Sequence, residues 1–116
     1  MLSAVLATLV GCAPAALPLP VAPYESRNLG VMINGQIVLA SMQVRALAGP
    51  VVVDNVGICV DGGADFPMSG GTITQTWLTV SSTRKFPAGD YTARACVTDG
   101  GRGQAVNGPT VVFTVN

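Results

Sequence analysis

The chain has 116 residues, a formal net charge of zero and only 10% charged residues. Six basic residues balance six acidic ones, so the sequence has neither the basic patch that binds nucleic acid nor the polybasic run that binds anionic lipid. Ordinary soluble domains carry about 25% charged residues. Either partner chains cover part of this surface, or Thr, Ser, Asn, Gln and Gly keep it soluble.

The first 24 residues differ in composition from the rest of the chain. They contain no charged side chain, and four of the eight prolines lie between Pro14 and Pro23. Proline fixes φ and removes an amide donor, so residues 13–24 are expected to form an extended, polyproline-like arm. The chain therefore divides into an apolar, Pro-rich arm or leader (residues 1–24) and a domain (residues 25–116).

The stretch LSAVLATLVGC precedes the prolines, and its apolar run of about ten residues is too short to span a bilayer but is typical of an export leader. Its end, LVGC, resembles the lipobox of bacterial lipoprotein signals, which implies lipidation of Cys12 and membrane contact only through that lipid. No Lys or Arg precedes the run, whereas leaders carry a positive segment there. The alternative is an arm that is retained and docks on another subunit. Its apolar anchors would be Leu2, Val5, Leu6, Leu9, Val10, Leu17, Leu19 and Val21.

Beyond Glu25 the pattern indicates strands throughout. Two β-rich runs flank Asn34-Gly35, a dipeptide favoured in tight hairpins. Further strands are expected after Pro50, over residues 72–80 and 90–99, and at the C-terminus, with Gly, Pro and Asn in the turns between them. No window has helical periodicity with caps. The sequence therefore predicts an all-β domain, a single antiparallel β-sandwich.

Alternation along residues 90–99 assigns the two faces of one strand. The core face holds Tyr91, Ala93, Ala95 and Val97, and the more exposed face holds Thr92, Arg94, Cys96 and Thr98. The final strand is expected to complete the core with Val111, Phe113 and Val115. Tyr91 directly follows a turn, so its hydroxyl is predicted to bond the backbone at that corner.

The segment FPAGDYTARACVTDGGRGQAVNGPTVVFTVN (residues 86–116) resembles the last two strands of bacterial and phage immunoglobulin-like (Ig-like) domains. The resemblance implies an Ig-like sandwich. The order Cys59, Trp77, Cys96 is similar to that of Ig domains, where a disulfide packs on a core Trp, so Trp77 is predicted as a core residue that is at least partly buried. Tyr91 and Cys96, however, differ by five positions and should face oppositely. Two alternatives remain for Cys59 and Cys96: a cross-strand disulfide on the outer face, or two reduced, half-buried thiols.

The sequence offers little for catalysis. Without histidine, triads and metal sites that use it are excluded, and no Gly-rich phosphate loop opens a helix. Four carboxylates near Gly-rich turns could bind calcium if they converged, although Asp in a turn more commonly bonds local backbone: Asp54, Asp61, Asp65 and Asp99. The sequence therefore predicts no enzyme activity, no cofactor and no metal, and Arg84-Lys85 is interpreted as a solubilising pair.

The Ig-like resemblance implies that the protein is a structural or decorating component of a particle, most naturally a phage virion. The domain would be exposed on the virion surface and would bind other protein subunits through residues 1–24. The alternative is a surface lipoprotein of the bacterial cell envelope, anchored at Cys12, whose domain serves adhesion or envelope contact. A small enzyme or inhibitor is a third class, for which the sequence holds no motif.

Overall fold

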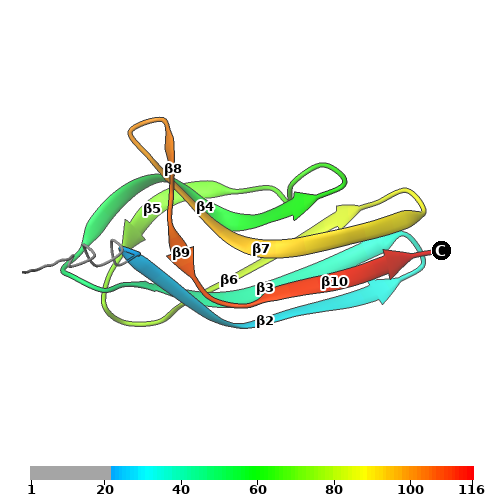
Figure 1. Ribbon diagram of the computed structural model, residues 1–116, viewed down its shortest axis with the longest axis horizontal. Helices are drawn as coiled ribbons and strands as arrows, with labels where there is room; N and C mark the ends of the chain where they lie inside the picture. The colour runs from blue at the N-terminus through cyan, green and yellow to red at the C-terminus, as the bar shows by residue number, and fades with distance from the viewer. Residues whose placement is uncertain (1–21) are drawn as a thin grey trace, which may run out of the picture.

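The computed structural model describes residues 22–116, and over this range its regular structure consists of strands that form two packed sheets (Figure 1). The first sheet contains β4 (Val51–Asp61), β5 (Ser69–Ile73), β7 (Gly89–Asp99), β8 (Arg102–Gln104) and β10 (Thr110–Val115). The second contains β2 (Tyr24–Asn34), β3 (Ile37–Ala46), β6 (Leu78–Lys85) and β9 (Val106–Asn107). The predicted all-β, two-layered fold is thus confirmed.

The strand order is β10-β7-β4-β5 in the first sheet, with β8 also beside β7, and β6-β3-β2-β9 in the second. Neighbouring strands run antiparallel except for β9, which makes a two-residue parallel pairing with the start of β2. The chain after β7 therefore contributes strands to both sheets: β8 belongs to the first, β9 to the second and β10 to the first. This short parallel pairing departs from the purely antiparallel prediction.

The predicted hairpin joins β2 and β3, but its turn lies one residue later than expected. Asn34 pairs with Ile37, which leaves Gly35 and Gln36 as the two turn residues. Gly35 has a φ of +62°, and a glycine with positive φ at the first turn position suits a type II′ turn. Asn34 stays in the ladder because glycine alone supplies the left-handed conformation that this turn needs.

The prediction of a single strand over residues 72–80 is wrong, because the structure divides these residues between the two sheets. β5 ends at Ile73 and β6 begins at Leu78 in the opposite sheet. In the connection, the Thr74 carbonyl accepts a hydrogen bond from the Ala46 N–H at 2.8 Å. The crossing contains neither Gly nor Pro, so the alternating pattern continues through it without a sequence signal for a break.

The core lies between the sheets and contains the predicted inner face of β7. The four side chains of that face are at most 8% exposed, and Phe113 and Val115 are buried beside them, with Val111 half-buried. The outward residues of β7 are half-buried or exposed, as expected. An aromatic cluster surrounds Phe86, whose ring centroid lies 5.2 Å from that of Phe66, 5.0 Å from Tyr91 and 5.6 Å from Phe113.

Tyr91 also makes the predicted corner contact. Its hydroxyl donates a hydrogen bond to the Pro87 carbonyl at 2.6 Å, so a buried ring keeps its polar atom satisfied.

Trp77, predicted as a core residue, lies outside the core. It is half-buried, and the guanidinium carbons of Arg27 and Arg45 lie 4.1 and 4.6 Å from its ring centroid. Arg45, which is paired to Glu25, lies between the buried Val44 and Ala46 and so faces outward. Trp77 sits in the connection between β5 and β6, where it packs on these cations outside the sandwich rather than within it.

Tyr24 begins β2 and is only 3% exposed. Burial raises the pKa of its phenol above the ordinary value of 10.0, and the Asp99 carboxylate raises this pKa further. The folded state therefore holds the phenolic proton more tightly than the unfolded chain, and this contribution is present below pH 10 and lost as pH rises through the folded pKa. We expect the free energy of unfolding to fall above about pH 10.

The measurement is urea denaturation at pH 8 to 11, with Tyr24→Phe as the comparison, because phenylalanine keeps the ring and removes the ionisable group. The variant should lose less stability over this range than the wild type. Equal slopes for both proteins would contradict the prediction.

Candidate functional site

The described sandwich has an opening between β5 and β6. Each of these strands is the outermost of its sheet within residues 22–116. A cavity of about 440 Å³ lies there, lined by Val56 of β4, by residues 69–72 and by residues 78–81. β5 and β6 follow one another in sequence but belong to opposite sheets (Figure 1).

Strand register identifies the side chains that face this opening. Leu78 pairs with Val44 and Val80 with Met42, and both partners are fully buried. On the other side, Gly71 pairs with the buried Val53. Because directly paired residues of antiparallel strands share a face, Leu78, Val80 and Gly71 point between the sheets. Ser69 pairs with the buried Val56 and faces the same way, so the interior of the opening combines apolar side chains with a hydroxyl.

The β5 side of the opening has unfilled space. A Cβ placed on Gly71 would meet no other atom within 4 Å, and the φ of this glycine is not positive. Glycine is therefore not required there by backbone strain or by a close contact. By contrast, a Cβ on the neighbouring Gly70 would lie 2.6 Å from the Asp54 carbonyl oxygen. Gly71 is the position at which the opening can be filled from within.

β6 presents a regular backbone edge. It makes eight consecutive pairs with β3 without a register shift. Alternate N–H and C=O groups of such an edge point away from the sheet, and proteins normally protect them with charge, proline or a bulge. Residues 78–83 have no charge and no proline, and only Arg84 and Lys85 at the end carry charge. Most of β6 can therefore accept a further strand.

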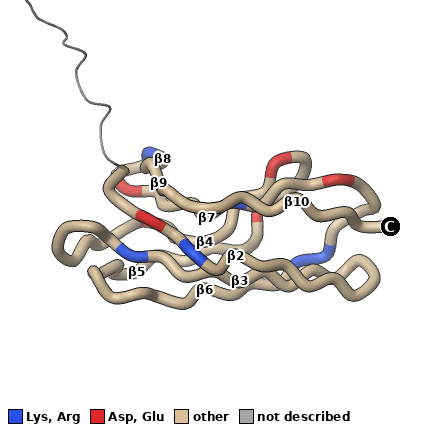
Figure 2. The backbone as a smooth tube through the Cα atoms, turned by 60° about the horizontal axis from the view of Figure 1, so that its bottom comes forward, with Lys and Arg blue, Asp and Glu red and all other residues tan. Residues whose placement is uncertain are grey.

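Exposed apolar side chains lie at several other places. Val52, Val112 and Met32 are 74, 72 and 71% exposed, and Met32 pairs with Leu39, itself 41% exposed. The charged residues of the described chain are spread singly or in small groups of both signs (Figure 2). On the described surface, exposed apolar side chains thus lie at separate places, and no large region carries charge of one sign.

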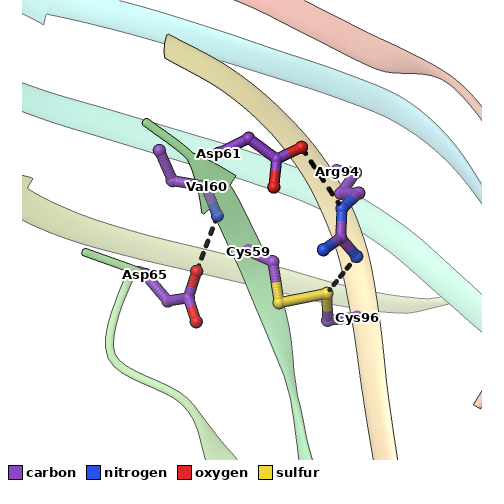
Figure 3. The surroundings of a disulfide bond; sticks show 6 residues. All are labelled: Cys59, Val60, Asp61, Asp65, Arg94 and Cys96. Carbon is purple, nitrogen blue, oxygen red and sulfur yellow. Dashed lines mark hydrogen bonds and ion pairs between the residues drawn. A yellow bond between two sulfur atoms is a disulfide. The ribbon is translucent and has the colours of Figure 1, made fainter. Parts of the chain in front are cut away.

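The structure joins Cys59 of β4 and Cys96 of β7 in a disulfide (Figure 3). Their Cα atoms are 5.8 Å apart on neighbouring strands of one sheet, and both residues alternate with buried neighbours, so the bond lies on the outer face. This is the first of the two alternatives from the sequence, and it differs from the inter-sheet bond of Ig domains. Arg94 lies beside it, donating a hydrogen bond to Cys96 Sγ at 3.0 Å.

Three of the four carboxylates considered as calcium ligands have a hydrogen-bond or ion-pair partner in the protein. Asp54 accepts a hydrogen bond from the Gly101 N–H at 2.9 Å, and Asp65 accepts one from the Val60 N–H at 2.7 Å. Asp61 lies 3.7 Å from the Arg94 guanidinium. Across residues 22–116, no three His, Cys, Asp or Glu side chains gather in a way that could hold a metal ion.

Cys12 and all eight proposed arm anchors lie outside the described residues, so lipidation and arm docking stay predictions. No helix in the described part of the chain is long and apolar enough to cross a membrane.

Comparison of the chain with protein-family models, with curated proteins and with solved structures finds no match. The assignment of function therefore depends on the geometry of the sandwich and on the composition of the chain.

Proposed function

We propose that this protein is a non-enzymatic structural or decorating subunit of a larger protein assembly, most naturally a phage virion. In this proposal an Ig-like sandwich projects from the particle surface, and residues 1–24 attach it to a neighbouring subunit. The observation that carries the proposal is the uncharged backbone edge of β6 beside an opening without charged side chains. Such an edge is suited to contact with another chain.

Energetics support an attachment role for residues 1–24. A charge-free apolar segment is a liability in water, whereas burial of each Leu or Val side chain contributes about 1.5–3 kcal/mol. Docking costs conformational entropy, and four prolines between Pro14 and Pro23 already restrict that freedom. Burial of several of the eight anchors can therefore offset the cost of ordering the arm.

Three features support the Ig-like assignment of the sandwich, and two depart from it. Two packed sheets, the Tyr91 corner bond and the sequence of residues 86–116 agree with it. The disulfide lies within one sheet, and Trp77 lies outside the core. The proposal is therefore an Ig-like sandwich that lacks the Cys-Trp-Cys core arrangement.

Deletion of residues 1–21 tests the attachment role, because Tyr24, which the sequence placed in the arm, begins β2 and is buried in the core. We expect the truncated protein to keep the β-rich circular dichroism spectrum of the full chain but to be absent from particles that incorporate the full chain. The loss follows because the deletion removes all eight anchors and leaves the strands of the sandwich in place. Incorporation of the truncated protein at full occupancy would overturn the proposal.

The LVGC sequence, together with the disulfide, supports a second candidate function, a lipoprotein of the bacterial cell envelope. Disulfides persist in oxidising compartments such as the periplasm and the cell surface. Anchored through a lipidated Cys12, the same sandwich would serve adhesion or envelope contact. In that case native protein begins at a lipidated Cys12 and leaves the membrane only with detergent, whereas the virion subunit retains residues 1–24.

A further inference from the structure

The opening between β5 and β6 has the features of a receiving site for an extended strand. We propose that residues 2–10 of a second copy of this chain bind there as an added strand beside β6. The inference rests on the attachment role proposed above for residues 1–24 and names the surface that receives them.

The backbone of β6 supplies the first half of the site. Its eight residues form an unbroken ladder with β3, so their outward N–H and C=O groups are evenly presented on the other side. An added strand pairs with these groups through main-chain hydrogen bonds. The positive charges of Arg84 and Lys85 discourage pairing at the far end of β6, which limits the contact to residues 78–83.

The opening supplies the second half, because alternate side chains of a strand beside β6 would point between the sheets. There they would meet Leu78, which is 38% exposed, together with the half-buried Val80 and the buried Val56. The space next to Gly71 gives them room. The lining combines Val and Leu side chains with the hydroxyls of Ser69, Thr72, Thr79 and Ser81 and holds no charged or aromatic group. This mixture suits a strand, which presents apolar side chains and backbone polar groups together.

Residues 2–10 have the composition that this site requires. They carry no charge and no proline, and their nine residues are enough to pair along the whole of residues 78–83. One face of such a strand would present Leu2, Leu6 and Val10. Prolines from Pro14 onward cannot donate to a ladder, so strand pairing is confined to the part before them.

The spacer that follows favours a second copy over the same chain. Residues 14–23, if extended as polyproline, span roughly 31 Å at about 3.1 Å per residue. β2 and β6 of one sheet are separated only by β3, a distance of roughly 10 Å at the usual strand spacing. A stiff spacer of this length carries residues 2–10 past the edge of their own sheet and toward a neighbour.

The test compares four full-length proteins by sedimentation velocity: wild type, Gly71→Ile, Thr110→Ile and Leu6→Asp. Gly71→Ile fills the opening from within. Thr110→Ile places the same side chain on the outer face of the first sheet, away from the opening, since Thr110 pairs with the exposed Arg94. Circular dichroism checks that each variant is folded. We expect wild type and Thr110→Ile to assemble, and Gly71→Ile and Leu6→Asp to lose the assembled species.

The other outcomes separate failure of this inference from failure of the proposed function. If Leu6→Asp prevents assembly while a folded Gly71→Ile still assembles, the arm docks elsewhere and only this inference is overturned. If Leu6→Asp assembles normally, the attachment role of the arm falls as well. A monomeric wild type also overturns the inference. In that case amide exchange along β6 shows whether the chain's own arm protects this edge or leaves it free for a different partner.

Discussion

Replacing Phe86 with alanine is expected to lower the free energy of unfolding by about 3–5 kcal/mol. Phe86 is 1% exposed, and its ring lies within 5.6 Å, centroid to centroid, of three other aromatic rings. Truncation removes its buried apolar surface and leaves a cavity that the surrounding β-strands cannot fully close. Native domains are stable by only about 5–15 kcal/mol, so this loss is a large fraction of the total stability.

Urea denaturation followed by circular dichroism measures this loss. Val52→Ala is the matched control because it also truncates an apolar side chain of the first sheet, but one that is 74% exposed, and it should change stability by less than about 0.5 kcal/mol. A Phe86→Ala protein that unfolds at the same urea concentration as the control would show that the aromatic cluster does not hold the sheets together.

Removal of the disulfide is expected to cost about 4 kcal/mol. Cys59 and Cys96 are 37 residues apart in sequence, and a crosslink over a loop of this size restricts the unfolded chain by about that amount in the loop-entropy model. Both cysteines lie on the outer face, so replacing them with alanine should leave the core packing unchanged. The effect therefore arises mainly from the greater entropy of the unfolded chain.

The comparison uses Cys59→Ala/Cys96→Ala, the wild type with and without reductant, and Cys12→Ala as the control. The double variant and the reduced wild type should unfold at the same lower urea concentration, whereas Cys12→Ala should match the oxidised wild type. If reductant leaves the denaturation midpoint unchanged, the crosslink contributes no stability and this prediction is wrong.

Alternation along a strand could be predicted from the sequence because it depends on neighbouring residues only. The inward face of β7 and the bond of the Tyr91 hydroxyl to Pro87 at the corner follow from such local order. Phe66 and Phe86 were missed as core residues because both lie outside strands. Each precedes a proline, which favours an extended backbone, and this repeated Phe-Pro pair is the signal that could have identified them.

The candidate site could not be predicted from local pattern, because it depends on which strands become edges. The lack of charge in residues 78–83 is visible in the sequence, but the exposure of β6 follows from long-range pairing in the order β6-β3-β2-β9. The split at residues 74–77, which places β5 and β6 in opposite sheets, has no Gly or Pro to mark it. The same split explains the wrong placement of Trp77, since a residue in a crossing need not follow the alternation of either strand.

The intact mass of the protein isolated from its native source tests the attachment role of residues 1–24 most directly. If these residues serve as the attachment arm, protein in the assembled particle has a mass that includes them, with Cys12 unmodified and Cys59 linked to Cys96. The attachment role would be contradicted by a mass that corresponds to a chain beginning at Cys12 with two or more acyl chains. A mass that corresponds to a chain beginning after Pro23 would contradict it as well.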